Sequence, residues 1–100
     1  MDENNLTNYQ SYLKFERNLT DNSVEAYLSD IKKLQDFVRP KGLSLCDVGQ
    51  SDVEEFLYDL HEVGISATSQ KRILVGVRSF YKFLRLEGVL EVDPTELIDA

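Results

Sequence analysis

Apolar residues recur three and four positions apart along most of this 100-residue chain, with no sustained alternation of apolar and polar residues. This spacing gathers apolar side chains on one face of an α-helix, whereas a half-buried strand requires a period of two. A chain of this length can bury one core but is too short for two domains with a catalytic cleft between them. The sequence therefore predicts a single all-α domain, a bundle of four helices.

The clearest helical period lies between Ser66 and Gly88. A helix of about 22 residues would be about 33 Å long, which is long for a small domain, and Gly88 is its natural C-terminal end. Full burial of each large apolar side chain stabilises a fold by about 1.5–3 kcal/mol. We therefore expect the apolar stripe of this helix to form the centre of the core: Ile73, Leu74, Val77, Phe80, Tyr81 and Leu84.

Two further helices are predicted before residue 42. The first spans residues 5–17 and is broken by the polar stretch 18–21; its inward-facing residues are expected to be Leu6, Tyr9, either Tyr12 or Leu13, and Phe15. The second begins at Asn22, with Glu25 as the partner in a capping box. Pro40 and Gly42 end it, because proline cannot continue the hydrogen-bond ladder. Its expected buried stripe is Val24, Tyr27, Leu28, Ile31, Leu34 and Val38.

The remaining helix is acidic and follows a connection over residues 41–50. Ser51 and Glu54 have capping-box spacing at its start, and Gly64 marks its end. Its expected apolar face is Val53, Phe56, Leu57 and Leu60. The helix carries no Lys or Arg, while its acidic residues are Asp52, Glu54, Glu55, Asp59 and Glu62. Such a surface repels DNA, so we expect it to face solvent or a partner protein.

Charge is distributed very unevenly along the chain. The segment Ser66–Gly88 holds five basic residues and one acidic residue, a net charge of +4, so the rest of a chain with net charge −7 carries −11. Within the helix, the residues Lys71, Val75, Arg78, Lys82 and Arg85 are spaced by four, three, four and three, and Arg72 and Ser79 flank them. This basic line lies opposite the apolar stripe. It indicates either a surface for a polyanion or, as a Lys/Arg face usually does, a merely solvated surface.

The start of the same helix adds small polar donors at Thr68, Ser69 and Gln70. Free backbone N–H groups and the positive end of the helix dipole already favour a phosphate there. Lys71 and Arg72 would then reach base edges or further phosphates. This arrangement is typical of a helix that enters a major groove about 12 Å wide.

Other features exclude several classes of function. Cys46 is the only cysteine, so the chain forms no intrachain disulfide and no thiolate metal cluster, and Cys46 is expected to be a small buried packing residue. The sole histidine, His61, lies on the acidic helix without convergent strong ligands, so we expect no metal site and no cofactor. The N-terminus is acidic and polar, and no apolar run approaches twenty residues. We therefore expect a cytoplasmic protein that does not associate with membranes.

Three segments, in this order, resemble the N-terminal core-binding domain of tyrosine recombinases, the Xer and phage-integrase group with a four-helix SAM-like fold. They are YLKFERNLTDNSVEAYLSDIKKLQDF, GLSLCDVGQSDVEEFLYDL and SATSQKRILVGVRSFYKFLRLEGVLEVDP. The likeness covers about residues 6–97 and depends on the order and spacing of the segments together. The chain departs from the family at Asp93-Pro94, where an Asn-Pro is common.

The resemblance implies a DNA-binding module of a site-specific recombinase or integrase, which clamps the recombination site together with a separate catalytic domain. Residues 1–88 would form this module, and residues 89–100 would begin the linker to the catalytic domain. The implied partners are double-stranded DNA and other recombinase subunits on the DNA, and the isolated domain is expected to be monomeric. The alternative function is an acidic helical module for protein interaction or oligomerisation.

The resemblance also names the residues that would contact DNA. Together with Lys82 of the basic line they are Thr68, Ser69, Lys71, Arg72 and Arg78 on the last helix, and Asn22, Ser23 and Tyr27 at the start of the second. Tyr27 also lies on the apolar stripe, so a core role is equally open for it. In this family the nucleophilic tyrosine and its Arg, Lys and His partners belong to the catalytic domain. We therefore expect no catalytic residue here and expect most of the tyrosines to be core: Tyr9, Tyr12, Tyr27, Tyr58 and Tyr81.

Overall fold

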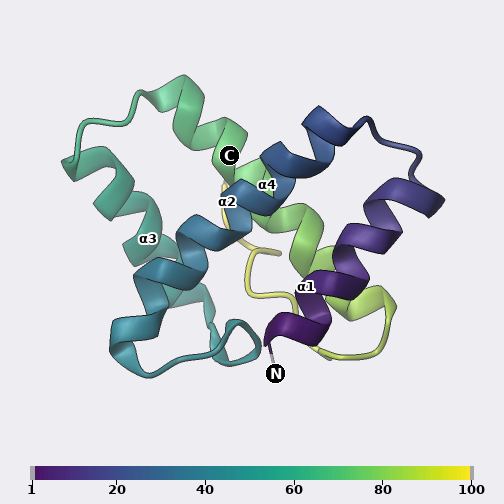
Figure 1. The fold of residues 1–100 in the computed structure, drawn as a ribbon. Coiled ribbons are helices and arrows are strands. Elements are labelled where there is room, and N and C mark those ends of the chain that lie inside the picture. The colour runs from purple at the N-terminus through teal and green to yellow at the C-terminus, as the bar shows by residue number, and fades with distance from the viewer. Residues whose placement is uncertain (1, 100) are drawn as a thin grey trace.

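The computed structural model describes residues 2–99 and consists of four α-helices joined by short turns, with no strand in that range. The helices are α1 (Asp2–Ser11), α2 (Asp21–Val38), α3 (Gln50–Glu62) and α4 (Ala67–Leu86). A π-helical turn, η1 (Tyr12–Glu16), extends α1, and the two 3₁₀ turns η2 (Arg39–Lys41) and η3 (Leu45–Asp47) connect α2 to α3. The all-α prediction of four helices is confirmed (Figure 1).

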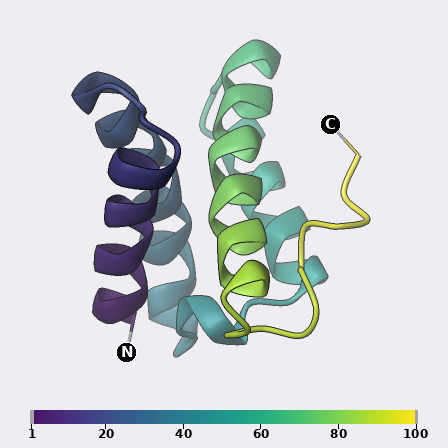
Figure 2. The same ribbon diagram turned by 90° about the vertical axis from the view of Figure 1, so that its right-hand side faces the viewer.

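Helix α4 lies at the centre of the arrangement. Figure 1 shows α2 crossing in front of α4, with the N-terminal ends of the two helices diverging on either side of the crossing point. Figure 2 shows α4 between the α1–α2 pair on one side and the C-terminal tail, residues 89–99, on the other. This long helix thus contacts the other three α-helices and the tail, which explains why its apolar stripe is so continuous.

The core is built around that stripe, and all six residues expected to face inward from α4 are buried. Phe80 packs edge-on against Tyr9, with ring centroids 5.2 Å apart, and against its neighbour Tyr81. The hydroxyl of Tyr81 donates a hydrogen bond of 2.8 Å to the Leu45 carbonyl, which satisfies the polar end of a buried ring. Phe83 is also buried and stacks between Tyr9 and Tyr12, a contact that the predicted stripe omitted.

Both expected N-caps, Asn22 and Ser51, were wrong by two residues. Helix α2 begins at Asp21, because the Oγ1 of Thr20, not Asn22, accepts the backbone N–H of Ser23 at 3.2 Å. Helix α3 begins at Gln50 with Gly49 as N-cap, and the Asp52 carboxylate accepts the Gly49 N–H at 2.9 Å. In each case the side-chain oxygen of a residue outside the expected capping box, Thr20 or Asp52, accepts a backbone N–H at the start of the helix. The expected ends at Gly64 and Gly88 are confirmed, since both adopt a positive φ.

The first helix differs from its prediction at both ends. It starts at Asp2 rather than near Asn5, and its last turn is π-helical. A π turn has more residues than an α turn and therefore rotates the following side chains around the axis. As a result Leu13 is buried and Tyr12 is half-buried, while Phe15, expected to face inward, is 76% exposed.

The tail expected to begin a linker packs against the rest of the domain. Ile98 is buried, and Thr95 is buried with both its N–H and its hydroxyl donating to Asp93 Oδ1 at 2.8 and 2.7 Å. The described part of the tail is therefore a folded segment that packs alongside α4. The boundary at residue 88 and the linker role stay predictions, and Met1 and Ala100 lie outside the described residues.

Candidate nucleic-acid interface

The outer face of α4 carries an exposed basic strip, defined as Lys71, Arg72, Arg78, Lys82 and Arg85. Arg78 is half-buried and the other four are exposed. The spacing that puts apolar residues into the core leaves these side chains on the opposite surface. The structure therefore brings the basic residues of α4 together as the sequence predicted, over a helix of 20 residues.

Thr68 and Ser69 lie exposed in the first turn of α4. The N-cap is Ser66, whose Oγ accepts the Ser69 N–H at 3.2 Å and donates to the Ser69 hydroxyl at 3.1 Å. The Ser69 hydroxyl therefore accepts one hydrogen bond, and its own O–H, like that of Thr68, remains available as a donor at this helix end.

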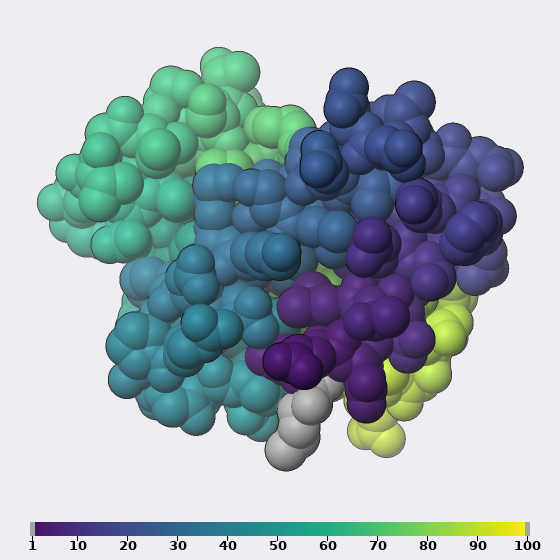
Figure 3. Space-filling view, in the orientation of Figure 1, coloured from purple at the N-terminus to yellow at the C-terminus, as the bar shows by residue number. Residues whose placement is uncertain are grey.

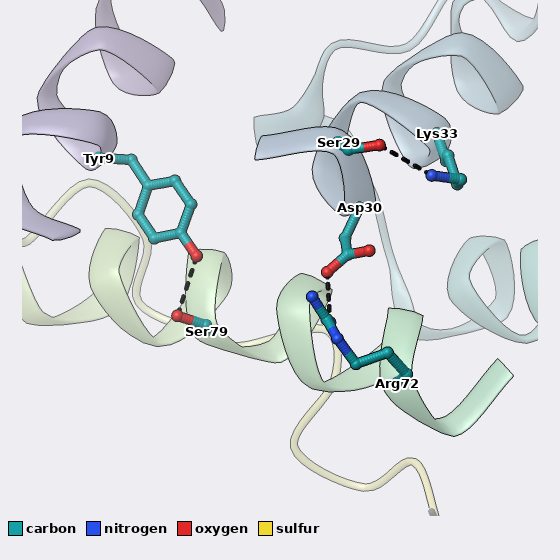
Figure 4. A network of polar contacts seen from close by, with 6 residues as sticks. All are labelled: Tyr9, Ser29, Asp30, Lys33, Arg72 and Ser79. Carbon is teal, nitrogen blue, oxygen red and sulfur yellow. Dashed lines mark hydrogen bonds and ion pairs between the residues drawn. The ribbon is translucent and has the colours of Figure 1, made fainter. Parts of the chain in front are cut away.

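One border of the strip is formed by α1 and α2. Figure 4 shows the Tyr9 hydroxyl donating to Ser79 Oγ at 2.9 Å and Arg72 Nη1 donating to Asp30 Oδ2 at 2.6 Å. Burial raises the pKa of Tyr9 to about 12, so this phenol stays a neutral donor at neutral pH. These two bonds tie the edge of the strip to the helices that pack beside it.

Arg72 has two partners on α2. Besides its bond to Asp30, its guanidinium lies over the Tyr27 ring, 5.3 Å from the centroid. The Asp30 side chain is only 7% exposed and the Arg72 side chain is 44% exposed. Burial raises the pKa of Asp30, and the hydrogen bond from Arg72 opposes that rise. Sequence reasoning missed Asp30; its place among the apolar residues of α2 was the available signal.

The three candidate DNA-contacting residues on α2 have different environments. Tyr27 is half-buried and contacts Arg72, so it joins the α4 candidates while also packing against the core. Asn22 is exposed, and Ser23 is half-buried with its hydroxyl accepting from Thr20 Oγ1 at 3.1 Å. Both lie in the first turn of α2, and the molecular surface is hollowed between that end and the start of α4 (Figure 3).

The other border of the strip is the tail, and it is acidic. Glu96 Oε1 lies 3.6 Å from Arg85 Nη1. A groove of about 670 Å³ separates the two segments and is lined by Arg78, Lys82, Arg85 and Leu86 of α4 and by Asp93, Thr95 and Glu96 of the tail. Further along, Asp99 and Lys71 line a smaller cavity near the start of α4. The sequence contained these acids, but their place beside the strip follows only from the folded path of the tail.

The residues expected to lie away from DNA have mixed environments. Helix α3 exposes Glu54, Asp59 and Glu62 as predicted, and Lys41 of η2 forms an ion pair with Glu55. Tyr9 and Tyr81 are buried, Tyr12 and Tyr27 are half-buried, and Tyr58 is 65% exposed on α3, so the core role fails for Tyr58.

Cys46 and His61 offer no site within the described range. Cys46 is half-buried rather than fully buried, its Sγ accepts a bond from Asn5 Nδ2, and burial raises the pKa of its thiol, which disfavours the reactive thiolate. His61 is exposed, and residues 2–99 contain no cluster of three side chains suited to a metal ion. Nor does that range contain a helix long and apolar enough to cross a membrane.

Comparison with known proteins places this fold in a family. Residues 6–88 match the model of the phage integrase N-terminal SAM-like domain. The chain is 38% identical over 85 residues to the tyrosine recombinase XerD of Rhizobium meliloti, and 38% identical over 87 residues to the tyrosine recombinase XerC of Oceanobacillus iheyensis. These alignments cover 85% and 86% of this chain but only 27% and 28% of those relatives.

A third relative, the tyrosine recombinase XerD of Chlorobaculum tepidum, is 32% identical over 93% of this chain and 31% of its own length. The chain thus spans less than a third of these curated relatives. No solved structure matches it. The family match begins within α1, covers α2, α3 and α4 in full and ends just beyond α4. The chain belongs to the family of phage integrase N-terminal SAM-like domains, as found in the tyrosine recombinases XerC and XerD.

Proposed function

We propose that this domain is the DNA-binding module of a site-specific tyrosine recombinase, holding the recombination site while a separate catalytic domain carries out the chemistry. The observation that carries the proposal is the basic strip on α4, an exposed line of cations in a protein whose net charge is −7. A protein with this overall charge is repelled by DNA except where its cations are concentrated. Relatives that are tyrosine recombinases support the same role.

The geometry of α4 suits a duplex. Its 20 residues make a rod about 30 Å long, and an α-helix fits the major groove. In this role Lys71, Arg78 and Lys82 neutralise phosphates, and Thr68 adds a neutral hydrogen bond at the helix start. Arg72, held at the edge of the strip, has donors left for a base edge or a further phosphate. The α2 candidates Asn22, Ser23 and Tyr27 complete the contact surface.

A titration of the isotope-labelled domain with a short duplex tests this proposal. At about 50 mM salt we expect the backbone amide signals of α4 to shift, with a Kd of roughly 10⁻⁴–10⁻⁶ M that weakens as salt rises. Nonspecific binding is independent of sequence, so any duplex serves. Unmoved α4 signals at saturating duplex would rule out DNA binding by this surface.

A second candidate function uses α3. Tyr58 on this helix and Val63, the residue that follows the helix, are both exposed. They lie among exposed acidic side chains of the helix: Glu54, Asp59 and Glu62. Such a surface suits contact with a neighbouring recombinase subunit rather than DNA. In the same titration, concentration-dependent shifts confined to α3 without DNA would favour this interaction role.

The tail is expected to weaken DNA binding, because Glu96 competes with phosphate for Arg85. We predict that Glu96→Gln tightens binding by about 2–5-fold, the range expected for removal of an exposed ion pair. Glu91→Gln is the matched control, since it removes the same charge from an exposed tail residue for which no ion pair is found within residues 2–99. Affinities from fluorescence anisotropy at one salt concentration provide the comparison, and equal effects of the two variants would refute a specific role for Glu96.

A further inference from the structure

Asp30 is an acid that the fold buries in the contact between α2 and α4, with its side chain only 7% exposed. Gly76 makes room for it, because any Cβ at position 76 would lie 2.0 Å from Asp30 Oδ2. A buried carboxylate destabilises a fold unless it is paired. The fold keeps this one, and its partner is Arg72, whose Nη1 donates to Oδ2 at 2.6 Å.

Arg72 is held at two points but remains accessible. The ion pair with Asp30 anchors one nitrogen, the Tyr27 ring lies under the guanidinium plane, and the side chain is still 44% exposed. A guanidinium has five N–H donors, so most of them are left for another acceptor. Fixing such a side chain in advance lowers the entropy lost when it binds a ligand. Figure 4 shows Asp30 reaching from α2 to the Arg72 side chain on α4.

We propose that Asp30 is a positioning residue, which with Tyr27 fixes the Arg72 guanidinium in the orientation that contacts DNA. Asp30 itself cannot contact the duplex, because it is buried and negatively charged. This inference rests on the proposed function, since it assigns a role to Asp30 only if α4 binds DNA. Hydrophobic residues often replace a buried charge without loss of stability. The positioning role explains why an acid is nevertheless found at this contact.

The variant Asp30→Asn separates positioning from a purely structural role. Asparagine has the same shape but no charge, so it removes the electrostatic anchor of Arg72. Because Arg72 reaches solvent, it is not left as a buried unpaired charge. We expect the thermal midpoint at neutral pH to be unchanged or higher, because a buried charge is gone, and duplex affinity to fall by about 3–10-fold. A structural role would instead lower the midpoint and leave affinity unchanged in the folded fraction.

A double-mutant cycle with Arg72→Gln completes the test. Glutamine is neutral and still offers a hydrogen bond to Asp30. Duplex affinity is measured for the wild type, Asp30→Asn, Arg72→Gln and the double variant at one low salt concentration. We expect Asp30→Asn to weaken binding in the wild-type background and to have no further effect in the Arg72→Gln background. Wild-type affinity in Asp30→Asn, or losses that multiply in the double variant, would overturn the inference.

Two additional measurements keep the outcomes distinct. Lys82→Ala reports on the proposed function alone. If Lys82→Ala weakens duplex binding while Asp30→Asn does not, only the positioning role fails. If the wild type does not bind the duplex, the proposed function itself fails. The Arg72 Nε–H signal of the free wild-type protein reports on positioning without any variant. We expect the chemical shift of this signal to differ from those of exposed arginines such as Arg17. An Arg72 Nε–H chemical shift equal to that of the exposed arginines would contradict the inference.

Discussion

Replacing both Lys71 and Lys82 with glutamate is expected to weaken duplex binding by about 10–100-fold and to lower the slope of log affinity against log salt by about 2. Both lysines are exposed on α4, and the structure gives neither an ion-pair partner among residues 2–99. Their substitution therefore breaks no ion pair found in that range, and we expect the loss of affinity to be electrostatic. Anisotropy titrations at several salt concentrations measure both quantities.

The matched control is Lys32→Glu with Lys33→Glu, which changes the net charge of the domain by the same amount. Lys32 and Lys33 line a groove between α1 and α2, with no α4 residue in its lining. We expect this control to weaken binding much less, because overall charge acts at longer range than a phosphate contact and is screened by salt. Equal losses in both pairs would mean that the domain responds only to its total charge and that α4 is not the interface.

The sequence does not reveal that Lys71 and Lys82 have different surroundings from Arg72. From spacing alone, Arg72 belongs to the same basic face and would be an equally good site for charge reversal. The structure shows that Arg72→Glu would place a second carboxylate against buried Asp30, so loss of binding could not be separated from unfolding. Periodicity assigns a residue to a side of a helix, but it does not reveal which neighbouring helix supplies its partner.

The fold was predictable to the extent that it depends on periodicity. The apolar stripe of α4 and the glycines that end α3 and α4 follow from spacing and from the backbone conformation that glycine permits. The start of α4 at Ser66 also followed, but the starts of α2 and α3 did not, because several adjacent residues can cap the same N–H groups. The exposure of Phe15 did not follow either, because a π turn shifts the register. The tail packed beside α4 depends on nonlocal contacts that no local pattern encodes.

Gly76→Ala is expected to be among the most destabilising single methyl additions on α4. The new Cβ would lie 2.0 Å from Asp30 Oδ2 and 2.6 Å from Asp30 Cβ and Cγ. Rotation about the Asp30 side-chain bonds can move Cγ and Oδ2, but Cβ is fixed by the α2 backbone, so α2 and α4 must move apart. Overpacking of this kind costs about 1–3 kcal/mol or more, and alanine recovers about 1 kcal/mol of helix propensity. We expect a net loss of about 2 kcal/mol, which lowers Tm by about 10 °C.

Two comparisons identify the cause of that loss. Val75→Ala changes the adjacent residue, which is 52% exposed, and should alter stability by no more than about 0.5 kcal/mol. In an Asp30→Gly background all three clashing atoms are absent, so Gly76→Ala should become stabilising by about 0.5–1 kcal/mol. Chemical denaturation of the four proteins in this cycle measures the change of sign. If Gly76→Ala destabilised both backgrounds equally, the close approach of α2 and α4 at Asp30 would not be the reason for glycine at this position.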